Sequence, residues 1–332
     1  SFQTQTKRLI GSELKQVRQL IDTRLQCRNP ELAQALQQMA SHGGKFLRPT
    51  LLLLVAKAAM PKDWTPATRS RLIQLGASIE ILHMATLIHD DIIDDSPKRR
   101  GQVSVQAQFG KDTAVYAGDL LFTKFFELLI ANLANDEYLQ INAQAMKKIL
   151  DGELGQMALR YHQQQQIIQY LRNVNGKTAA LFQLAASEGA HFAGADRQTT
   201  AYAARFGQNL GIAFQMIDDL LDYTDQGKLN KPVMQDLATG VYSLPLLMAL
   251  QQPATAKELQ PLLEQPLTHA SEQQIKTIVI NSGALDEARQ LAQRFTQKAD
   301  QWLAKLPDSP AQRLLVQLTQ QLMQKNPFSR PR

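Results

Sequence analysis

The chain has 332 residues, of which 44% are hydrophobic, and a formal net charge of +6. This composition is typical of a folded globular protein and excludes an intrinsically disordered one. A single cysteine, Cys27, excludes a disulfide framework, and the longest apolar run, residues 51–56, is too short to cross a bilayer. Without a basic stripe, the modest positive charge favours small anions over nucleic acid. The single cysteine suits a reducing cytosol, so we expect a cytoplasmic protein.

Nearly every segment has the residue types and the spacing of a helix. Leu285, Leu291, Phe295 and Ala299 recur at helical intervals, whereas no stretch alternates β-branched residues as a strand would. Breaks are expected at residues 61–66, 95–101, 227–240, 251–266 and 307–310. No linker is long or polar enough to separate two domains, so we predict one all-α domain over residues 1–332.

Two cations follow a flexible diglycine at residues 43–44. Lys45 and Arg48 are three residues apart, and such side chains in a loop or at a helix end bind phosphate and carboxylate groups. They are the first candidates for binding an anion.

An Asp-Asp-x-x-Asp pattern closes the apolar segment that ends near residue 93. Positions i and i+4 share a helix face, so Asp90 lies above Asp94, with Asp91 beside them. Closely packed carboxylates repel one another unless a cation neutralises them, and magnesium bridges carboxylates to phosphates. The pattern therefore predicts a magnesium–diphosphate site, and His83, two turns earlier near the same face, is a candidate hydrogen-bond donor to a phosphate.

Further cations follow along the chain. Arg99 and Arg100 lie one turn past the first motif, within reach of the predicted metal site. Lys177 and Thr178 precede an apolar helix expected over residues 179–186, where Thr178 is expected to cap the helix and Lys177 to meet an anion.

The aspartate pattern recurs at Asp218, Asp219 and Asp222, again within apolar helical sequence. A solvated acidic face could explain one copy, but two copies in apolar surroundings favour a diphosphate held between two metal-loaded helices that face a central cavity. Lys231 follows the second motif and extends the cationic set.

In this order, the segments resemble the trans-isoprenyl diphosphate synthases, or polyprenyl synthases, of the long-chain type. Among them the chain is similar to the catalytic subunit (component II) of the heptaprenyl synthases. The matching motifs are GGKFLRP at 43–49, HMATLIHDDIIDD at 83–95, KRRG at 98–101, GD at 118–119, GKTAALF at 176–182, GIAFQMIDDLLDY at 211–223 and KPVMQDLATGVYSLP at 231–245. The resemblance implies the isoprenoid synthase fold with a deep central cavity, a homodimer, and Mg²⁺, with three ions when substrate is bound.

The resemblance also implies a reaction and a role for each site residue. An allylic diphosphate such as farnesyl diphosphate would bind through Mg²⁺ to Asp90, Asp91, Asp94, Asp218, Asp219 and Asp222, with direct contacts from Arg99, Lys177, Thr178, Gln215 and Lys231. Isopentenyl diphosphate, held by Lys45, Arg48, His83 and Arg100, would attack the allylic cation through its double bond. The apolar product would bring the enzyme into transient contact with a membrane surface.

The length of the product depends on the room below the first motif. Short-chain relatives commonly place a bulky aromatic residue five positions before the first aspartate, where this chain has Ala85, followed by Thr86. Helix spacing puts Ala85 about one and a half turns below Asp90, which predicts a product of about six to eight isoprene units, C30–C40. Phe122, Phe125 and Phe126 could form a deeper floor, and a shorter geranylgeranyl or farnesyl product is the alternative.

The chain departs from the family pattern at one cation, because Val241 follows Gly240 where many relatives have lysine. The loop that contains Lys231 also lacks a common glycine. A subunit that is inactive without a small regulatory partner therefore stays open as an alternative, and so does a terpene cyclase. A cyclase would need no isopentenyl diphosphate site, so Lys45, Arg48 and His83 argue against it.

A different metal enzyme is the remaining rival. Glu80 with His83, and Glu188 with His191, both follow the Glu-x-x-His pattern of di-iron bundles. Such a site would leave both aspartate motifs without a role.

Overall fold

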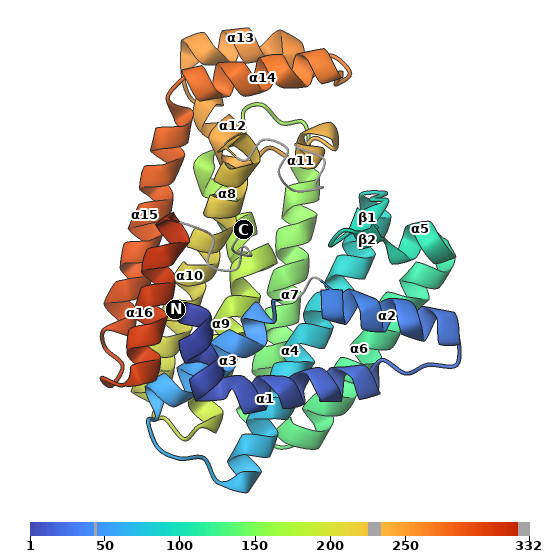
Figure 1. The fold of residues 1–332 in the computed structure, drawn as a ribbon. Helices are drawn as coiled ribbons and strands as arrows, with labels where there is room; N and C mark the ends of the chain where they lie inside the picture. Colours follow the sequence, from blue (N-terminus) through green and yellow to red (C-terminus); the bar gives the residue numbers. More distant parts are fainter. Residues whose placement is uncertain (43–44, 225–233, 325–332) are drawn as a thin grey trace.

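The computed structural model describes residues 1–42, 45–224 and 234–324 (Figure 1). The N-terminal half contains α1 (Phe2–Arg24), α2 (Pro30–His42), α3 (Leu47–Ala59), α4 (Pro66–Ile93), β1 (Lys98–Arg99), β2 (Gln102–Val103), α5 (Val105–Phe109), α6 (Lys111–Leu133) and α7 (Glu137–Ala158). The C-terminal half contains α8 (Ile167–Val174), the π-helical turn η1 (Asn175–Ala179), α9 (Ala180–Phe192), α10 (Arg197–Thr224), α11 (Gln235–Ala238), α12 (Leu244–Leu250), α13 (Pro253–Glu264), α14 (His269–Asn281), α15 (Ala284–Leu303) and α16 (Pro310–Gln324).

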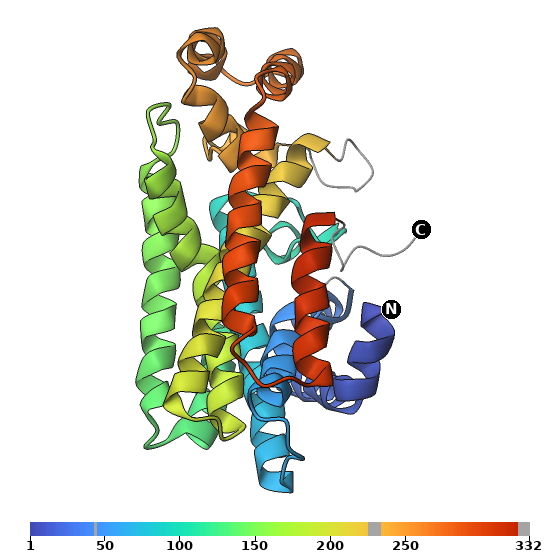
Figure 2. The same ribbon diagram turned by 90° about the vertical axis from the view of Figure 1, so that its left-hand side faces the viewer.

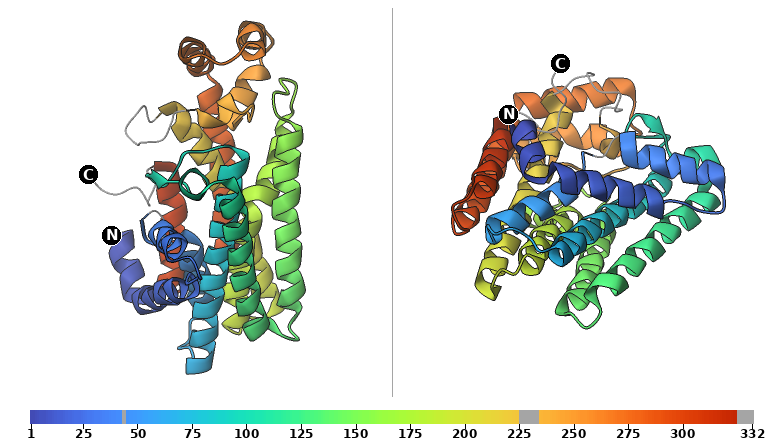
Figure 3. Two further views of the ribbon diagram at one scale, coloured as in Figure 1. Left: turned by 90° about the vertical axis from the view of Figure 1, so that its right-hand side faces the viewer. Right: turned by 60° about the horizontal axis from the view of Figure 1, so that its bottom comes forward.

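The long helices pack side by side into one bundle. Helix α4 packs against α6, α3 against α9, and α10 lies between α9 and α15. Figure 2 shows α7 and α8 (green) at one edge of the bundle and the N-terminal helices (blue) at the other. The hairpin of α13 and α14 lies across one end (Figure 3). The described residues share a continuous hydrophobic core, which confirms the predicted all-α fold.

Helix α4 carries the first aspartate motif through the centre of this bundle. It begins at Pro66 after Thr65, whose side chain accepts a hydrogen bond from Thr68 N, so a cap and a first-turn proline set its start. By length and hydropathy alone this helix could span a membrane, but 72% of its apolar window is buried inside the bundle. Its apolar character is that of a core helix.

Three expected breaks turn out to contain regular structure, and α11 (Gln235–Ala238) lies in the one expected at residues 227–240. Pro253–Glu264 forms α13 within the break expected at residues 251–266, because a proline in the first turn costs the helix no hydrogen bond. Residues 98–103 form a two-stranded hairpin, although no strand was expected. Its turn residues Arg100 and Gly101 both have positive φ, as the tight turn of a two-residue hairpin requires. Helix α16 begins at Pro310, at the end of the break expected at residues 307–310, with Ser309 Oγ accepting from Gln312 N over 3.1 Å.

Candidate active site

The first aspartate motif occupies the last turn of α4 and the residues that follow it. Asp91 is buried, and Arg99 donates to both of its carboxylate oxygens, with a shortest distance of 2.6 Å between Nη2 and Oδ1. Asp94 lies 3.3 Å from Arg160 Nη2. Burial raises the pKa of Asp90 to about 7, and the nearby Glu153 carboxylate adds to the rise. The motif therefore holds several neighbouring carboxyl groups, and a bound cation would relieve their mutual repulsion.

Lys177 supplies a cation beside this motif from η1. Its Nζ lies 3.7 Å from Glu153 Oε2 and 2.8 Å from Gln156 Oε1. Burial alone would lower the pKa of Lys177, but Glu153, Asp90 and other nearby carboxylates outweigh it and raise that pKa. The ammonium therefore stays charged at the mouth of the site.

Two glycines bring α7 close enough to η1 to place this lysine. A Cβ atom on Gly152 would lie 2.4 Å from Lys177 N, and one on Gly176 would lie 2.3 Å from Lys148 O. Both contacts are to backbone atoms, which cannot move away as the end of a flexible side chain could. The close approach of the two backbones fixes Lys177 against Glu153.

The second aspartate motif lies in the last turns of α10. Asp219 is buried, and its carboxylate accepts hydrogen bonds from Tyr170 Oη (2.5 Å), Gln215 Nε2 (2.9 Å) and Leu244 N (3.2 Å). Burial raises the pKa of Asp219 to about 7 against the lowering effect of these donors. Asp218 is exposed and Asp222 partly accessible. The two outer carboxylates thus present their charge to the solvent side, while Asp219 is fixed by the protein.

Thr178 links η1 to the second motif. Its Oγ1 hydrogen-bonds to Gln215 Oε1 over 3.0 Å, and Gln215 in turn contacts Asp219. The expectation that Thr178 caps a new helix is wrong, because η1 runs on into α9 without a break and its hydroxyl bonds another helix. Neighbouring residues of η1 therefore face the two motifs, Lys177 the first and Thr178 the second.

A second cluster of charge lies on the other side of the first motif. Arg100 Nη1 donates to Met39 O over 3.0 Å, and its Nη2 lies 3.8 Å from Glu80 Oε1. The guanidinium of Arg48 lies over the Phe182 ring at 5.1 Å, and its Nε has no hydrogen-bond partner. Burial lowers the pKa of Arg48 to about 10, and burial with the nearby arginines lowers that of His83 well below its ordinary value. This cluster suits a second anion.

The hairpin after the first motif separates the two clusters. Arg99, the last residue of β1, reaches Asp91, whereas Arg100, the first residue of the turn with a positive φ, reaches Glu80. The tight turn thus brings two adjacent arginines to two different carboxylates, Asp91 and Glu80.

The remaining predicted residues are placed as follows. Lys45 is exposed just before α3, Ala85 is fully buried, and Thr86 is partly accessible with its Oγ1 donating to His83 O. Lys231 lies outside the described residues. Phe125 is buried, but Phe126 is 45% exposed, so the expectation that Phe126 forms part of an inner floor is wrong.

Four functional neighbours were missed by the sequence analysis or given another role: Glu80, Glu153, Arg160 and Tyr170. Helix periodicity could have found Glu153, because it lies on the inward face of α7. Arg160 comes from a loop and has no such signal. Val241 lines a cleft with Tyr170, Lys177 and Asp219, so the missing cation concerns this site.

No three histidine, cysteine, aspartate or glutamate side chains converge on a ready-made metal position within the part of the chain that the structure describes. Magnesium usually takes only one or two protein carboxylates and completes its shell with water and substrate phosphates. The partly accessible Asp90 and Asp94, together with Asp218 and Asp222, fit that donor set.

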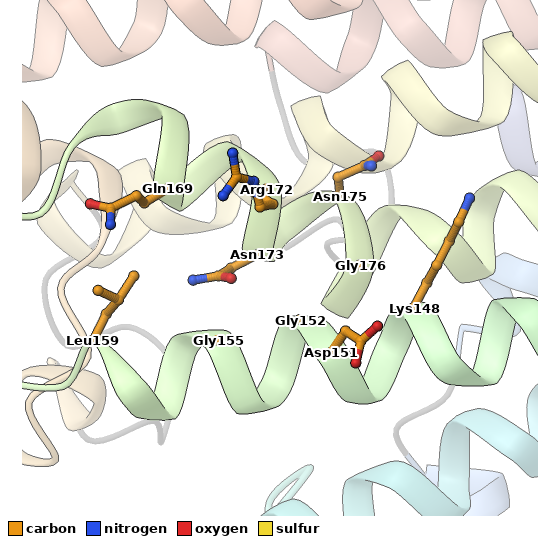
Figure 4. A pocket seen from close by; sticks show the side chains of 10 residues that line it. All are labelled: Lys148, Asp151, Gly152, Gly155, Leu159, Gln169, Arg172, Asn173, Asn175 and Gly176. Carbon is orange, nitrogen blue, oxygen red and sulfur yellow. The ribbon is translucent and has the colours of Figure 1, made fainter.

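A separate groove runs along the contact of α7 with α8 and η1. It has a volume of about 490 Å³ and is lined by Lys148, Asp151, Gly152, Gly155, Leu159, Gln169, Arg172, Asn173, Asn175 and Gly176 (Figure 4). None of the predicted site residues lines it.

The di-iron alternative does not match the geometry. Glu80 faces Arg100, and Glu188 accepts a hydrogen bond from Asn142 Nδ2 over 2.8 Å. His191 lies 3.4 Å from Asp136. The two Glu-x-x-His pairs are therefore engaged in separate contacts.

Comparison with known proteins identifies the family of the chain. Residues 29–280 match the family model described as polyprenyl synthetase. The chain is 37% identical over 281 residues to an all-trans-nonaprenyl-diphosphate synthase (geranyl-diphosphate specific) of Rhodobacter capsulatus, covering 83% of this chain and 84% of that protein. It is 31% identical over 288 residues to heptaprenyl diphosphate synthase component 2 of Bacillus subtilis, covering 86% and 80%.

A solved structure is equally close. The geranylgeranyl pyrophosphate synthase of Lactobacillus brevis superposes with a TM-score of 0.88 at 36% identity, covering 95% of this chain and 97% of that one. The chain belongs to the polyprenyl synthetase family, as a long-chain trans-isoprenyl diphosphate synthase.

Proposed function

We propose that this prenyltransferase binds its allylic diphosphate between the two aspartate motifs and isopentenyl diphosphate at the cluster of Arg48, His83 and Arg100. The observation that carries the proposal is the division of charge around α4. On one side Lys177 lies among the carboxylates of the first motif, and on the other the partly buried Arg48 and Arg100 lie near Glu80. Lys45, exposed at the start of α3, extends the second cluster towards solvent.

Mg²⁺ would be held by the six aspartates of the two motifs, with three ions when substrate is bound. Exposure favours Asp90, Asp94, Asp218 and Asp222 as the ligands that face the substrate, because Asp91 and Asp219 are buried. Asp91 and Asp219 already bind Arg99 and Tyr170, so they support a positioning role until substrate arrives. When bound, the metal neutralises the diphosphate and helps it to depart.

The chain's own residues then act on the two diphosphates. Arg99, Lys177, Thr178, Gln215 and Lys231 are proposed to contact the allylic diphosphate, and of these Lys231 lies outside the described residues. Positive charge that is already in place stabilises the negative charge developing on the leaving group. The double bond of isopentenyl diphosphate attacks the allylic carbon, and the released diphosphate takes the proton that the new product loses. Buried apolar surroundings exclude water, which would quench the cation.

We propose farnesyl diphosphate as the primer and a product of C30–C40. Small side chains at Ala85 and Thr86 support a long product. The Rhodobacter relative is named as specific for geranyl diphosphate, so geranyl and farnesyl diphosphates are the two primers to compare. A geranylgeranyl product, as the name of the Lactobacillus enzyme indicates for that protein, is the alternative.

We propose that the enzyme is a homodimer in the cytoplasm. Large apolar side chains are 40–74% exposed on adjoining faces of α6 and α7: Val115, Tyr116, Phe126, Ile130, Leu139, Leu150, Leu154 and Met157. Within each helix they recur on one face, and the two helices contact each other. A second copy would bury this surface. A small regulatory partner remains the alternative, since the Bacillus relative is named as one component of an enzyme.

Two arginine variants separate the two diphosphate sites. Arg48→Gln is expected to raise the KM for isopentenyl diphosphate at least tenfold and to leave the KM for the allylic substrate nearly unchanged. Arg99→Gln is expected to do the reverse, with the exposed neighbour Lys98→Gln as its control. If both variants changed the two KM values equally, the proposed division of the site would be wrong.

A further inference from the structure

Glu188 on α9 and Asn142 on α7 form a polar pair inside the apolar core. Both are fully buried, and Asn142 Nδ2 donates to Glu188 Oε1 over 2.8 Å and to Tyr138 O over 2.8 Å. Glu188 Oε2 and Asn142 Oδ1 have no hydrogen-bond partner. Burial raises the pKa of Glu188 to about 8, so the side chain is a neutral acid at neutral pH. Unpartnered buried polar atoms are rare, and these two need a reason.

The pair of Glu188 and Asn142 lies deeper in the protein than the active site. Lys177 and Glu153 join the same two chain segments at the mouth of the site. Glu188 and Asn142 join them again eleven residues farther along each segment, about 16 Å deeper at 1.5 Å per residue. Eleven residues are three helical turns, so Asn142 shares the inward face of α7 with Glu153. The pair lies in line below the diphosphate site.

Helix α4 also packs against α9. The guanidinium of Arg71 near the start of α4 lies 5.4 Å from the Phe192 ring at the end of α9. This contact places the start of α4 beside the end of α9. Leu184 and Leu181 are buried and share the α9 face of Glu188, at positions one and two turns nearer to the site.

The exposure of side chains differs between the active-site end of these helices and the level of the Asn142–Glu188 pair. Towards the active site, Thr86 and Leu87 on α4 and Met146 on α7 are partly accessible, although the two apolar ones pack against the core. At the level of the pair and beyond it, Leu75, Ile79 and Tyr138 are 0–4% exposed. Partly accessible side chains thus occur on the active-site side of the pair, whereas these three residues at its level and beyond are buried.

We propose that Asn142 and Glu188 form the end wall of the path taken by the growing hydrocarbon chain and so set the length of the product. The inference rests on the proposed function. An apolar chain end cannot satisfy Glu188 Oε2 or Asn142 Oδ1, and to pass between them it must also break their mutual hydrogen bond, so growth past this level is disfavoured. Ala85 keeps the upper part of the path open, and the polar pair closes it.

The proposed end wall is tested by measuring the product length of purified variants. Each variant is incubated with farnesyl diphosphate, labelled isopentenyl diphosphate and Mg²⁺. Glu188→Leu, Asn142→Leu and the double variant are expected to lengthen the main product by at least one isoprene unit. Glu188→Gln keeps the size and a hydrogen-bonding end, and is expected to keep the wild-type length. Gln144→Leu, on the exposed face of α7, is the matched control for an added leucine.

A variant on the active-site side of the pair gives a second test if the leucine variants do not fold. Met146→Phe adds volume one turn nearer to the active site and is expected to shorten the product by at least one unit. Unchanged length in the folded leucine variants, or in Met146→Phe, overturns the proposal, and so does lengthening by Glu188→Gln equal to that of Glu188→Leu. A wild-type protein that incorporates no isopentenyl diphosphate, alone and after addition of cell extract, would instead refute the proposed function.

Discussion

The hydroxyl of Tyr170 donates a hydrogen bond to Asp219 Oδ2 over 2.5 Å and so ties α8 to the second aspartate motif on α10. Burial and the neighbouring carboxylate raise the pKa of Tyr170 well above its ordinary value, so the phenol remains a donor. Gln215 holds the other oxygen of Asp219. The centre of the second motif is therefore fixed by the protein before any substrate binds.

Replacing this tyrosine tests how much that fixed geometry matters. Tyr170→Phe removes a hydrogen bond to an acid group, which contributes about 1.5–3 kcal/mol, so kcat/KM is expected to fall about tenfold to a hundredfold. Steady-state kinetics at several Mg²⁺ concentrations measure the effect. Tyr161→Phe is the control, because its hydroxyl donates to Ala238 O outside the two motifs. Equal kinetics for wild type and Tyr170→Phe would contradict the positioning role.

The close contact between α7 and η1 predicts a difference between two glycines. Gly152→Ala would drive a methyl group against Lys177 N, which belongs to backbone, and is expected to lower stability by about 1–3 kcal/mol and to displace Lys177. Gly155→Ala meets only the side-chain end of Asn173 and should cost much less. Urea unfolding together with the KM for the allylic diphosphate distinguishes them, and equal effects would count against this account of η1.

The buried acid of Glu188 predicts a pH dependence of stability. Its pKa is about 8 in the folded state, above the ordinary value of 4.5, so the folded protein keeps a proton that the unfolded chain has lost between these values. Stability contributed by this proton is complete below pH 4.5 and is lost as the pH rises towards 8, with a slope of about 1.4 kcal/mol per pH unit. Glu188→Gln cannot titrate. Urea unfolding from pH 5.5 to 7.5 should show the wild type losing stability relative to Glu188→Gln, and parallel curves would contradict the assignment.

The buried position of Ala85 predicts a change of product. A phenylalanine there would stand about one and a half turns below Asp90, and Ala85→Phe is expected to shorten the product by several isoprene units. Thin-layer chromatography of dephosphorylated products measures the length. Ala85→Ser, which is nearly the same size, serves as the control, and a full-length product from Ala85→Phe would show that the chain takes another route.

The exposed apolar face of α6 and α7 predicts the oligomeric state. Ile130 and Leu154 are 64% and 62% exposed, and Leu154→Asp is expected to convert a dimer into a monomer in sedimentation velocity. Asp151→Ala, an exposed neighbour on α7, should leave the dimer intact. A wild-type monomer would refute the proposed homodimer.

The sequence predicted the helices and both aspartate motifs because each depends on local spacing. Asp90 and Asp94 must share a face in any helix, and an apolar stretch around them must be buried. It could not predict the contacts that come from distant segments, such as Arg160 with Asp94 or Tyr170 with Asp219. The opposite directions of Arg99 and Arg100 depend on a hairpin of two-residue strands, which is too short to leave a pattern.

Phe126 illustrates the same limit. It neighbours the buried Phe125, and only the packing of α6 against α4 decides which of the two faces the core. Thr178 was expected to cap a helix because a polar residue precedes an apolar run. The π-helical turn carries the helix through that position and frees the hydroxyl for Gln215.

Product analysis of the purified chain alone tests the central claim most directly. The chain is incubated with farnesyl diphosphate, labelled isopentenyl diphosphate and Mg²⁺, with and without EDTA, and the dephosphorylated products are separated by length. The account predicts an EDTA-sensitive ladder that ends at a long all-trans polyprenyl product. No incorporation with either the farnesyl or the geranyl primer, in the chain alone and after addition of cell extract, would contradict it.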